Sequence, residues 1–184
     1  MKKTRKTTLL IVQAGVIAAV YAALTYFSSL FGLAYGGVQF RLSEALTILP
    51  VFTPAAIPGL AVGCIIANII SPNGILDMIL GPTATLLAAI ASRLLGRICF
   101  KGLPVLSLLP PVLFNALIIG GMLTYLGNTF TVTAFLPYAI SVGAGQAVVC
   151  FGLGLPLAAA LKKTGIFKAA DSSRLVRADA KNQN

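Results

Sequence analysis

The segment VQFRLSEALTILPVFTPAAIPGLAVGCIIANI, residues 38–69, decides the fold of this chain. After its first few residues it is apolar enough and long enough for one membrane-spanning helix, which needs about 20 such residues. It is interrupted by three prolines, Pro50, Pro54 and Pro58. Because each proline removes a backbone donor and disfavours a helix at the residue before it, we expect two short helices instead, near Leu42–Val51 and Ala55–Ile70.

Four longer apolar runs flank this segment, and each is long enough to cross the hydrocarbon layer of a membrane. They are Thr8–Leu33, Ile75–Leu95, Val105–Leu126 and Thr133–Leu161. Of the 184 residues, 58% are hydrophobic and only 10% are charged, which is more apolar surface than one small soluble core buries. The sequence therefore predicts an all-α membrane protein, a six-transmembrane-helix bundle with a short proline-broken second helix.

The basic residues orient this bundle, because Lys and Arg accumulate on the cytoplasmic side of a membrane. With six spans and the N-terminus inside, cytoplasmic segments hold 13 of the 14 Lys and Arg residues, and Arg41 is left on the outer side. Both termini are then cytoplasmic, and this topology explains the net charge of +10 without a nucleic acid partner. We divide the chain into a basic N-terminus at 1–7, a transmembrane substrate-binding domain at 8–162, and a polar, basic tail at 163–184 that is disordered or contacts lipid.

Several absences separate the function classes. The chain has no His, and its four Asp and Glu residues form no paired acid–base motif, so we expect no enzyme. It has no G-x-x-x-x-G-K-[ST] loop, so any ATP that drives transport would be hydrolysed by partner subunits. Three widely spaced cysteines, Cys64, Cys99 and Cys150, suit small buried hydrophobes rather than a metal site. We therefore expect neither a metal nor a cofactor on this chain.

Two ionisable residues, Arg41 and Glu44, lie three positions apart where the short second helix begins. One interpretation is an ion pair that anchors the start of the helix, and Arg41 could instead extend to the lipid headgroups. The other is a binding site, because ionisable side chains at membrane depth mark functional sites by default. Asp77, which follows the SPNG turn, either meets the dipole of the helix it begins or contacts a ligand.

Amides and small residues complete the candidate set. Asn68, Asn115 and Gln146 each suit a bridge between two helices. Together, around Glu44, they could line a polar cavity that opens outward. Small side chains let helices approach closely, either within the bundle or with a partner protein. Two rows of them run along the first helix: Ala14, Ala18 and Ala22, and then Gly15, Ala19 and Ala23.

With its Arg-Leu-Ser-Glu-Ala stretch and the prolines that follow, the segment at 38–69 resembles the QueT family, substrate-binding S components of energy-coupling factor (ECF) vitamin transporters. The resemblance runs from about Thr8 to Leu161. It implies the six-helix S-component fold and a partner set of one transmembrane coupling protein and two cytoplasmic ATPases. It also implies uptake of queuosine precursors, which are 7-deazaguanine bases. The docking face for the partners would be the row Ala14, Ala18 and Ala22.

This substrate class implies roles for the candidate residues. A guanine-like edge presents an N–H beside an amino group, and the carboxylate of Glu44 could accept both. Asp77 could meet an aminomethyl cation, amides could satisfy other ring atoms, and an aromatic side chain could stack on the flat ring. Tyr35 is one stacking candidate. The full set of candidate binding residues is Gln39, Phe40, Arg41, Glu44, Asn68, Asp77, Asn115, Tyr138 and Gln146.

We also consider other functions. A stand-alone transporter or channel would use Glu44 and Asp77 as a proton or ion path. An S component for a different vitamin would keep the fold and change the ligand. An assembly protein would use only its small-residue helix faces, and an intramembrane enzyme fits these residues least. The segment at 32–40 is either an outer gate or an ordinary turn.

Overall fold

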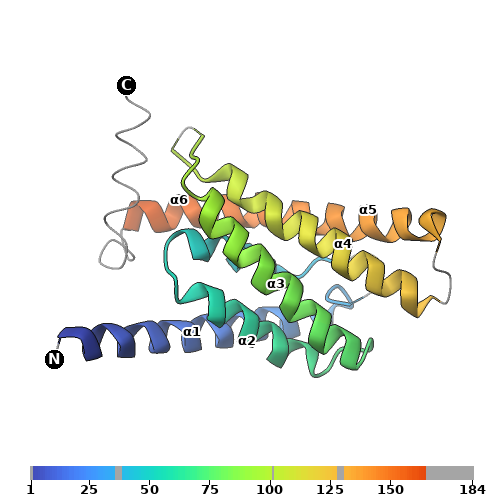
Figure 1. Cartoon of the computed structure of the whole chain (residues 1–184), viewed down its shortest axis with the longest axis horizontal. Coiled ribbons are helices and arrows are strands. Elements are labelled where there is room, and N and C mark those ends of the chain that lie inside the picture. Colours follow the sequence, from blue (N-terminus) through green and yellow to red (C-terminus); the bar gives the residue numbers. More distant parts are fainter. Residues whose placement is uncertain (1, 36–38, 101, 128–130, 165–184) are drawn as a thin grey trace.

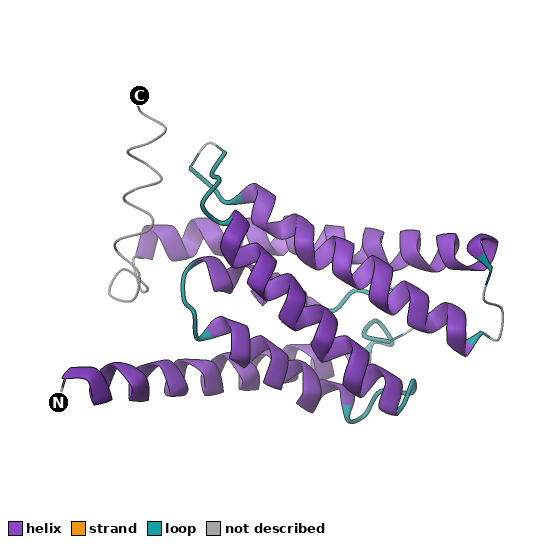
Figure 2. Cartoon of the chain, in the orientation of Figure 1, coloured by secondary structure: helices purple, strands orange, loops and turns teal. Residues whose placement is uncertain are grey.

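The computed structural model describes residues 2–35, 39–100, 102–127 and 131–164, and the named elements in these ranges are all helices (Figure 2). The polar tail beyond Thr164 and residues 36–38 of the expected gate lie outside the described residues. Four helical stretches are long and apolar enough to cross a membrane, which confirms the four long spans predicted from the sequence. They are Lys6–Leu30, Ile75–Leu95, Val105–Leu126 and Val132–Thr164.

The first helix, α1, runs from Lys2 to Leu30 and is roughly 44 Å long at 1.5 Å per residue, enough to cross a bilayer. It ends at Gly32, whose φ of 69° is a left-handed conformation that glycine adopts without a steric penalty. The N–H of Gly32 donates to the carbonyl of Ser29, and the N–H of Leu33 donates to the carbonyl of Ser28. This pair of bonds is a Schellman motif, which turns the chain sharply after the helix.

The proline-rich segment forms a 3-10 helix, η1 (Leu42–Val51), and a short α-helix, α2 (Ala56–Asn68). Pro54 has no N–H that could donate a hydrogen bond to the carbonyl of Pro50, four residues earlier. A side chain supplies the missing hydrogen bond, because Nη1 of Arg93 donates to the Pro50 carbonyl at 2.6 Å. Pro54 lies between η1 and α2, and Arg93 binds the Pro50 carbonyl to which Pro54 cannot donate.

The remaining helices continue the bundle. After Gly74 comes α3 (Ile75–Leu95), and a short 3-10 helix, η2 (Val105–Leu108), leads into α4 (Leu109–Leu126). Pro110 and Pro111 stand in the first turn of α4, where the helix needs no backbone donor.

The last stretch of helix has three parts. The first, α5 (Val132–Val149), is followed without a break by a single π-helical turn, η3 (Cys150–Gly154), and then by α6 (Leu155–Thr164). Pro156 cannot donate to the carbonyl of Gly152, which favours a widened turn at this point. π-Helical turns are rare and occur often at functional sites.

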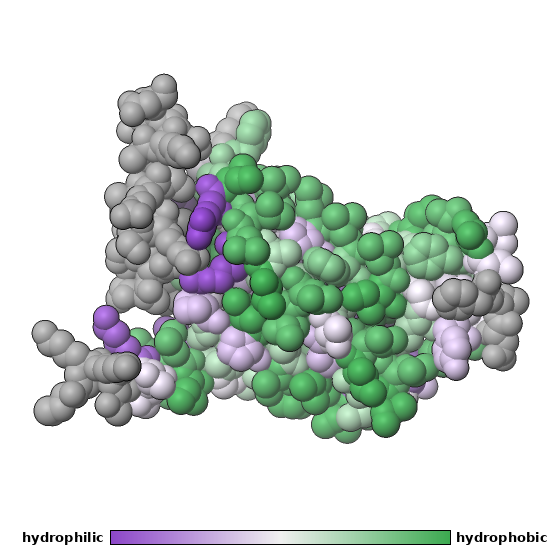
Figure 3. All heavy atoms as spheres, in the orientation of Figure 1, coloured by the Kyte–Doolittle hydropathy of each residue, from purple (hydrophilic) through white to green (hydrophobic). Residues whose placement is uncertain are grey.

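The helices lie roughly side by side, and the N-terminus, the α3–η2 connection and α6 gather at one end of the bundle (Figure 1). Apolar side chains cover the middle of the face shown in Figure 3, whereas hydrophilic residues gather at the end that carries α6. Large apolar residues such as Ile11 and Ile75 are 67% and 71% exposed. A surface of this kind suits contact with lipid, and it matches the membrane class predicted from the composition.

The two small-residue rows of α1 face in different directions. The carbonyls of Ala14 and Ala18 each lie 2.8 Å from the position that a Cβ would take on Gly59 and Gly63 of α2. The row Ala14, Ala18 and Ala22 therefore packs inside the bundle, and the expectation that it is a partner-docking face is not met. The row on the open side of the helix is Gly15, Ala19 and Ala23.

Candidate functional site

Seventeen polar or charged side chains are buried in the described part of this apolar bundle. Several of them contact Glu44 or Asp77 and so form two groups. Each group has one carboxylate at its centre. We call them the Glu44 centre, formed with Tyr21 and Gln146, and the Asp77 centre, formed with Arg41, Asn68 and Ser71.

In the Glu44 centre, both carboxylate oxygens accept a hydrogen bond from the protein. The hydroxyl of Tyr21 on α1 donates to Oε1 at 2.5 Å, and Nε2 of Gln146 on α5 donates to Oε2 at 2.6 Å. Glu44 is 2% exposed and Tyr21 is fully buried. Charge-assisted bonds of this length are among the stronger ones in proteins. The carboxylate thus ties together two helices that are far apart in the sequence.

Neighbouring hydroxyl and thiol groups extend this network. Oγ1 of Thr25 on α1 donates to Oγ of Ser43 at 2.7 Å, and Oγ1 of Thr47 donates to the main-chain carbonyl of Glu44 at 2.6 Å. Sγ of Cys150, in the π-helical turn η3, lies 3.6 Å from Oγ1 of Thr47. The short helix η1 is therefore held by polar contacts to α1 on one side and to η3 on the other.

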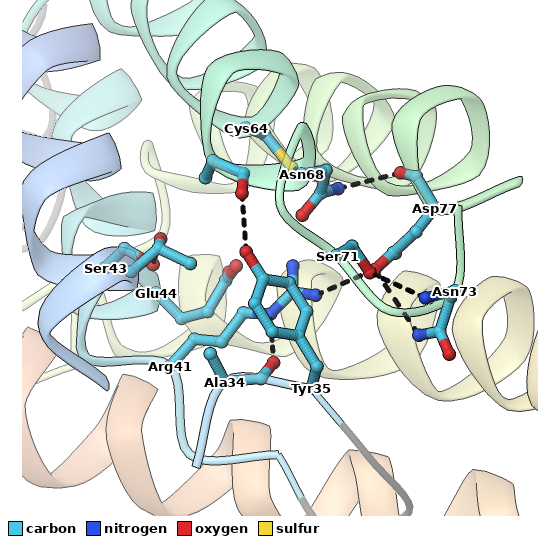
Figure 4. Close-up of polar contacts among 12 residues, drawn as sticks. Ala34, Tyr35, Arg41, Ser43, Glu44, Cys64, Asn68, Ser71, Asn73 and Asp77 are labelled. Atoms are coloured by element: carbon cyan, nitrogen blue, oxygen red, sulfur yellow. Dashed lines mark hydrogen bonds and ion pairs between the residues drawn. The ribbon is translucent and has the colours of Figure 1, made fainter. Parts of the chain in front are cut away.

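The Asp77 centre lies where η1 begins, α2 ends and α3 begins (Figure 4). Oδ2 of Asp77 accepts from Oγ of Ser71 at 2.5 Å and pairs with Nη2 of Arg41 at 3.4 Å. Nδ2 of Asn68 donates to the main-chain carbonyl of Asp77 at 2.7 Å. Asn68 and Asp77 are fully buried, and Arg41 is 5% exposed. The pair is thus a buried one, with hydrogen bonds on both partners.

Arg41 also fixes the segment between α1 and η1. Its Nε donates to the carbonyl of Ala34 at 2.7 Å, and its guanidinium carbon lies 4.9 Å from the centre of the Tyr35 ring. The hydroxyl of Tyr35 donates to the carbonyl of Ala67 near the end of α2 at 2.5 Å. Burial raises the pKa of the Tyr35 phenol to about 12. This segment is thus anchored to the Asp77 centre at both Tyr35 and Arg41.

Two acceptor atoms of the Asp77 centre have no hydrogen-bond partner among the described residues. They are Oδ1 of Asp77 and Oδ1 of Asn68, both buried. In folded proteins about nine in ten buried polar atoms are paired, so two such atoms on neighbouring side chains are unusual. Ser92 Oγ, on the same helix as Asp77, is the third buried side-chain atom of the described residues in this state.

The structure corrects two expectations about Arg41. In the described part of the chain, its ion pair is with Asp77 on α3 and not with Glu44 three residues later. The backbone at Arg41 is extended, with φ −80° and ψ 109°, so its side chain does not follow the helical spacing to Glu44. Because Arg41 is buried among protein groups, it does not extend to the lipid headgroups.

Four other predicted residues lie outside both centres. Nδ2 of Asn115 donates to the Pro111 carbonyl of its own helix, and Tyr138 packs against an apolar cluster of α4 and α5. Gln39 is buried, with its main-chain carbonyl against Gly145. Phe40 lines a separate groove of about 490 Å³ whose walls are almost wholly apolar. Of the residues expected around one cavity, Glu44 and Gln146 share one polar centre, and Asn68 lies in the other.

Tyr21, Thr25 and Ser43 belong to the polar network but are not among the residues predicted from the sequence. One signal was present: Tyr21 and Thr25 are four residues apart and lie on the α1 face that carries the buried row of alanines. Ser71, the first residue of the SPNG turn, is not among the predicted residues either. In the described residues, no three His, Cys, Asp or Glu side chains lie together as a metal site would require.

Comparison with known proteins identifies the family of this chain. The sequence matches the QueT transporter family over residues 11–163. It is 37% identical over 86 residues to the queuosine precursor transporter QueT of Lactococcus lactis subsp. cremoris (strain MG1363). The aligned part covers 47% of this chain and 49% of that protein, so the chain spans about half the length of this curated relative. No solved structure gives a significant match. The chain is therefore a multi-pass membrane protein that belongs to the QueT transporter family, a family of transporters rather than enzymes.

Proposed function

We propose that this protein is the substrate-capture subunit for uptake of queuosine precursors, which are 7-deazaguanine bases, by an ATP-driven ECF transporter. The family match over most of the chain and the name of the Lactococcus relative support transport of such a precursor. The observation that carries the proposal is a pair of buried carboxylate centres inside a membrane bundle. Ionisable groups are costly in that environment and are kept there mainly for function.

The proposed topology has six membrane segments with both termini in the cytoplasm. The six segments are the four long spans together with η1 and α2. Its support is that the N-terminus, the α3–η2 connection and α6 gather at one end of the bundle (Figure 1), and the Lys and Arg residues other than Arg41 lie in or next to these parts of the sequence or in the tail that follows α6. The Asp77 centre then faces the outer side of the membrane, where a capture subunit meets its substrate.

The proposed ligand site is built from both centres, with Gln39, Phe40, Asn115 and Tyr138 as outlying candidates. A 7-deazaguanine is flat, carries several N–H donors, and suits a site of buried acceptors. A buried carboxylate binds N–H donors more strongly than a neutral group does, because the hydrogen bond is charge-assisted.

The proposed energy source is ATP hydrolysis by two cytoplasmic ATPases, coupled through one transmembrane partner. We place the docking face for that partner on the open side of α1, at Gly15, Ala19 and Ala23, because the neighbouring row is already covered by α2. Small side chains there allow the close helix contact on which association in lipid depends.

An uptake assay tests this proposal. Proteoliposomes would hold either this chain alone or this chain with the coupling protein and both ATPases, and would receive labelled 7-cyano-7-deazaguanine. We expect uptake only by the full assembly and only with ATP, and no uptake of riboflavin. ATP-independent uptake by the chain alone would instead support a stand-alone transporter. Failure of the folded chain to bind any deazaguanine would refute the substrate class.

A further inference from the structure

The two unpaired acceptors of the Asp77 centre are held in place by their own neighbours. Asn68 must turn its Nδ2 toward the main-chain carbonyl of Asp77, which accepts at 2.7 Å, so its Oδ1 points elsewhere. Oδ2 of Asp77 is occupied by Ser71 and Arg41, so Oδ1 is the oxygen left over. Both side chains are fully buried. Each therefore presents one fixed acceptor that no described protein group satisfies.

The two acceptors belong to side chains of residues that contact each other, and α3 has a glycine beside that contact. A Cβ added to Gly81 would overlap Nδ2 of Asn68 and would lie 3.4 Å from Oδ1 of Asp77. The amide and the carboxylate thus share the space that a side chain at position 81 would fill. Asn68 and Asp77 thus each leave one acceptor unsatisfied on neighbouring side chains, and a ligand edge with two adjacent donors would pair with both.

The two carboxylates differ in what they can still accept. Both oxygens of Glu44 already take a strong protein donor, one from Tyr21 and one from Gln146. The charge of Asp77 is already balanced by Arg41, so a second cation would gain little there. The Asp77 centre therefore suits neutral N–H donors better than an aminomethyl cation, the group that a ligand of this class could also carry.

We infer that Oδ1 of Asp77 and Oδ1 of Asn68 accept the adjacent ring N–H and amino group of the transported heterocycle, and that they determine its specificity. This inference rests on the proposed function and names the atoms of that site that recognise the ligand. Glu44 is then a positioning residue that holds η1 between α1 and α5. Because both acceptors are buried, the ligand reaches them when the surrounding helix ends separate and then close over it.

The test compares two ligands on the purified full chain by calorimetric titration. One is 7-cyano-7-deazaguanine, and the other is 7-cyano-7-deazaadenine, whose corresponding edge has a ring acceptor and a C–H in place of the two donors. We expect the parent to prefer the guanine form by at least about tenfold, because an unpaired buried acceptor costs that much binding. Asp77→Asn and, as a second variant, Asn68→Ala should each reduce that preference by about tenfold.

Glu44→Gln makes the same carboxylate-to-amide change in the other centre and tests whether that centre determines the specificity instead. It should keep the preference between the two ligands even if its affinity for both falls. A preference that is lost in Glu44→Gln but retained in Asp77→Asn and Asn68→Ala overturns the inference and leaves the proposed function standing. Equal binding of both ligands by the parent also overturns it. If the folded parent binds neither ligand, the proposed function itself fails.

Discussion

The hydroxyl of Tyr21 donates to Oε1 of Glu44 at 2.5 Å, and this bond joins the middle of α1 to the start of the proline-broken segment. Tyr21 is fully buried, and Glu44 is 2% exposed. Removing the donor would leave a buried carboxylate oxygen without a partner. A group in that state loses its hydration and gains nothing in return, so the bond should matter for stability more than an exposed one does.

Tyr21→Phe should therefore lower the free energy of unfolding by about 1–3 kcal/mol. Thermal unfolding in detergent measures this, followed by the reaction of a thiol dye with the buried Cys64 and Cys150 in a Cys99→Ser background. Tyr125→Phe is the matched control, because Tyr125 is 62% exposed and the change should cost less than about 0.5 kcal/mol. Equal midpoints for the two variants would show that the Tyr21 bond adds nothing.

Gly63→Ala should force α1 and α2 apart. The added Cβ would lie 2.8 Å from the carbonyl oxygen of Ala18 and 2.8 Å from Cβ of Tyr21, closer than real contacts allow. Overpacking of this kind costs about 1–3 kcal/mol, more than the helix propensity that alanine gains. Gly15→Ala is the control, because nothing lies within 4 Å of its Cβ position. The same unfolding assay should show a loss for the first variant and none for the second.

The long spans could be predicted from the sequence, because a membrane helix requires about 20 apolar residues and each long run meets that requirement by itself. The effect of Pro50 and Pro54 on their own backbone neighbours can likewise be stated from the sequence, because a proline has no N–H to donate. Both properties are local. They need no knowledge of which helix packs against which.

The partners within the site could not be predicted in this way. Arg41 pairs with Asp77, 36 residues later, because the extended backbone at Arg41 turns its side chain away from Glu44. The two rows of α1 have nearly the same composition, and only the glycines of α2 decide that the row with Ala18 is buried. Both outcomes depend on contacts between segments that are distant in the sequence.

Arg93→Gln should destabilise the connection between η1 and α2. Arg93 donates to the Pro50 carbonyl at 2.6 Å, and Pro54 has no N–H to replace it. Hydrogen bonds from charged donors contribute about 1.5–3 kcal/mol, so we expect a loss in that range. Arg97→Gln removes the same charge from an exposed residue at the same end of α3 and should be nearly neutral. A similar loss in both variants would assign the effect to charge alone.

The Tyr35 phenol should make the fold sensitive to high pH. Burial raises its pKa to about 12 in the folded chain, whereas an unfolded chain has a pKa of about 10. The folded state favours the neutral phenol, so this contribution is complete below about pH 10 and is lost as the pH rises toward 12. Unfolding midpoints of the parent should fall across that window more steeply than those of Tyr35→Phe. Parallel curves would mean that Tyr35 titrates alike in both states.

Gly81→Ala should separate ligand binding from stability. Alanine in place of a helical glycine contributes about 1 kcal/mol, which roughly offsets the loss of the 2.7 Å bond from Asn68 to the Asp77 carbonyl when the new Cβ displaces the amide. The unfolding midpoint should therefore change little.

The affinity of the same variant for 7-cyano-7-deazaguanine should fall by about tenfold, because the displaced amide no longer presents Oδ1 of Asn68 to the ligand. Gly15→Ala gains the same propensity without touching the site, so it should keep the parent's affinity in the same titration. If Gly81→Ala binds like the parent while Asp77→Asn does not, the ligand meets the carboxylate of Asp77 without the amide of Asn68. In that case, the second donor of the ligand would bind a different acceptor in the bundle.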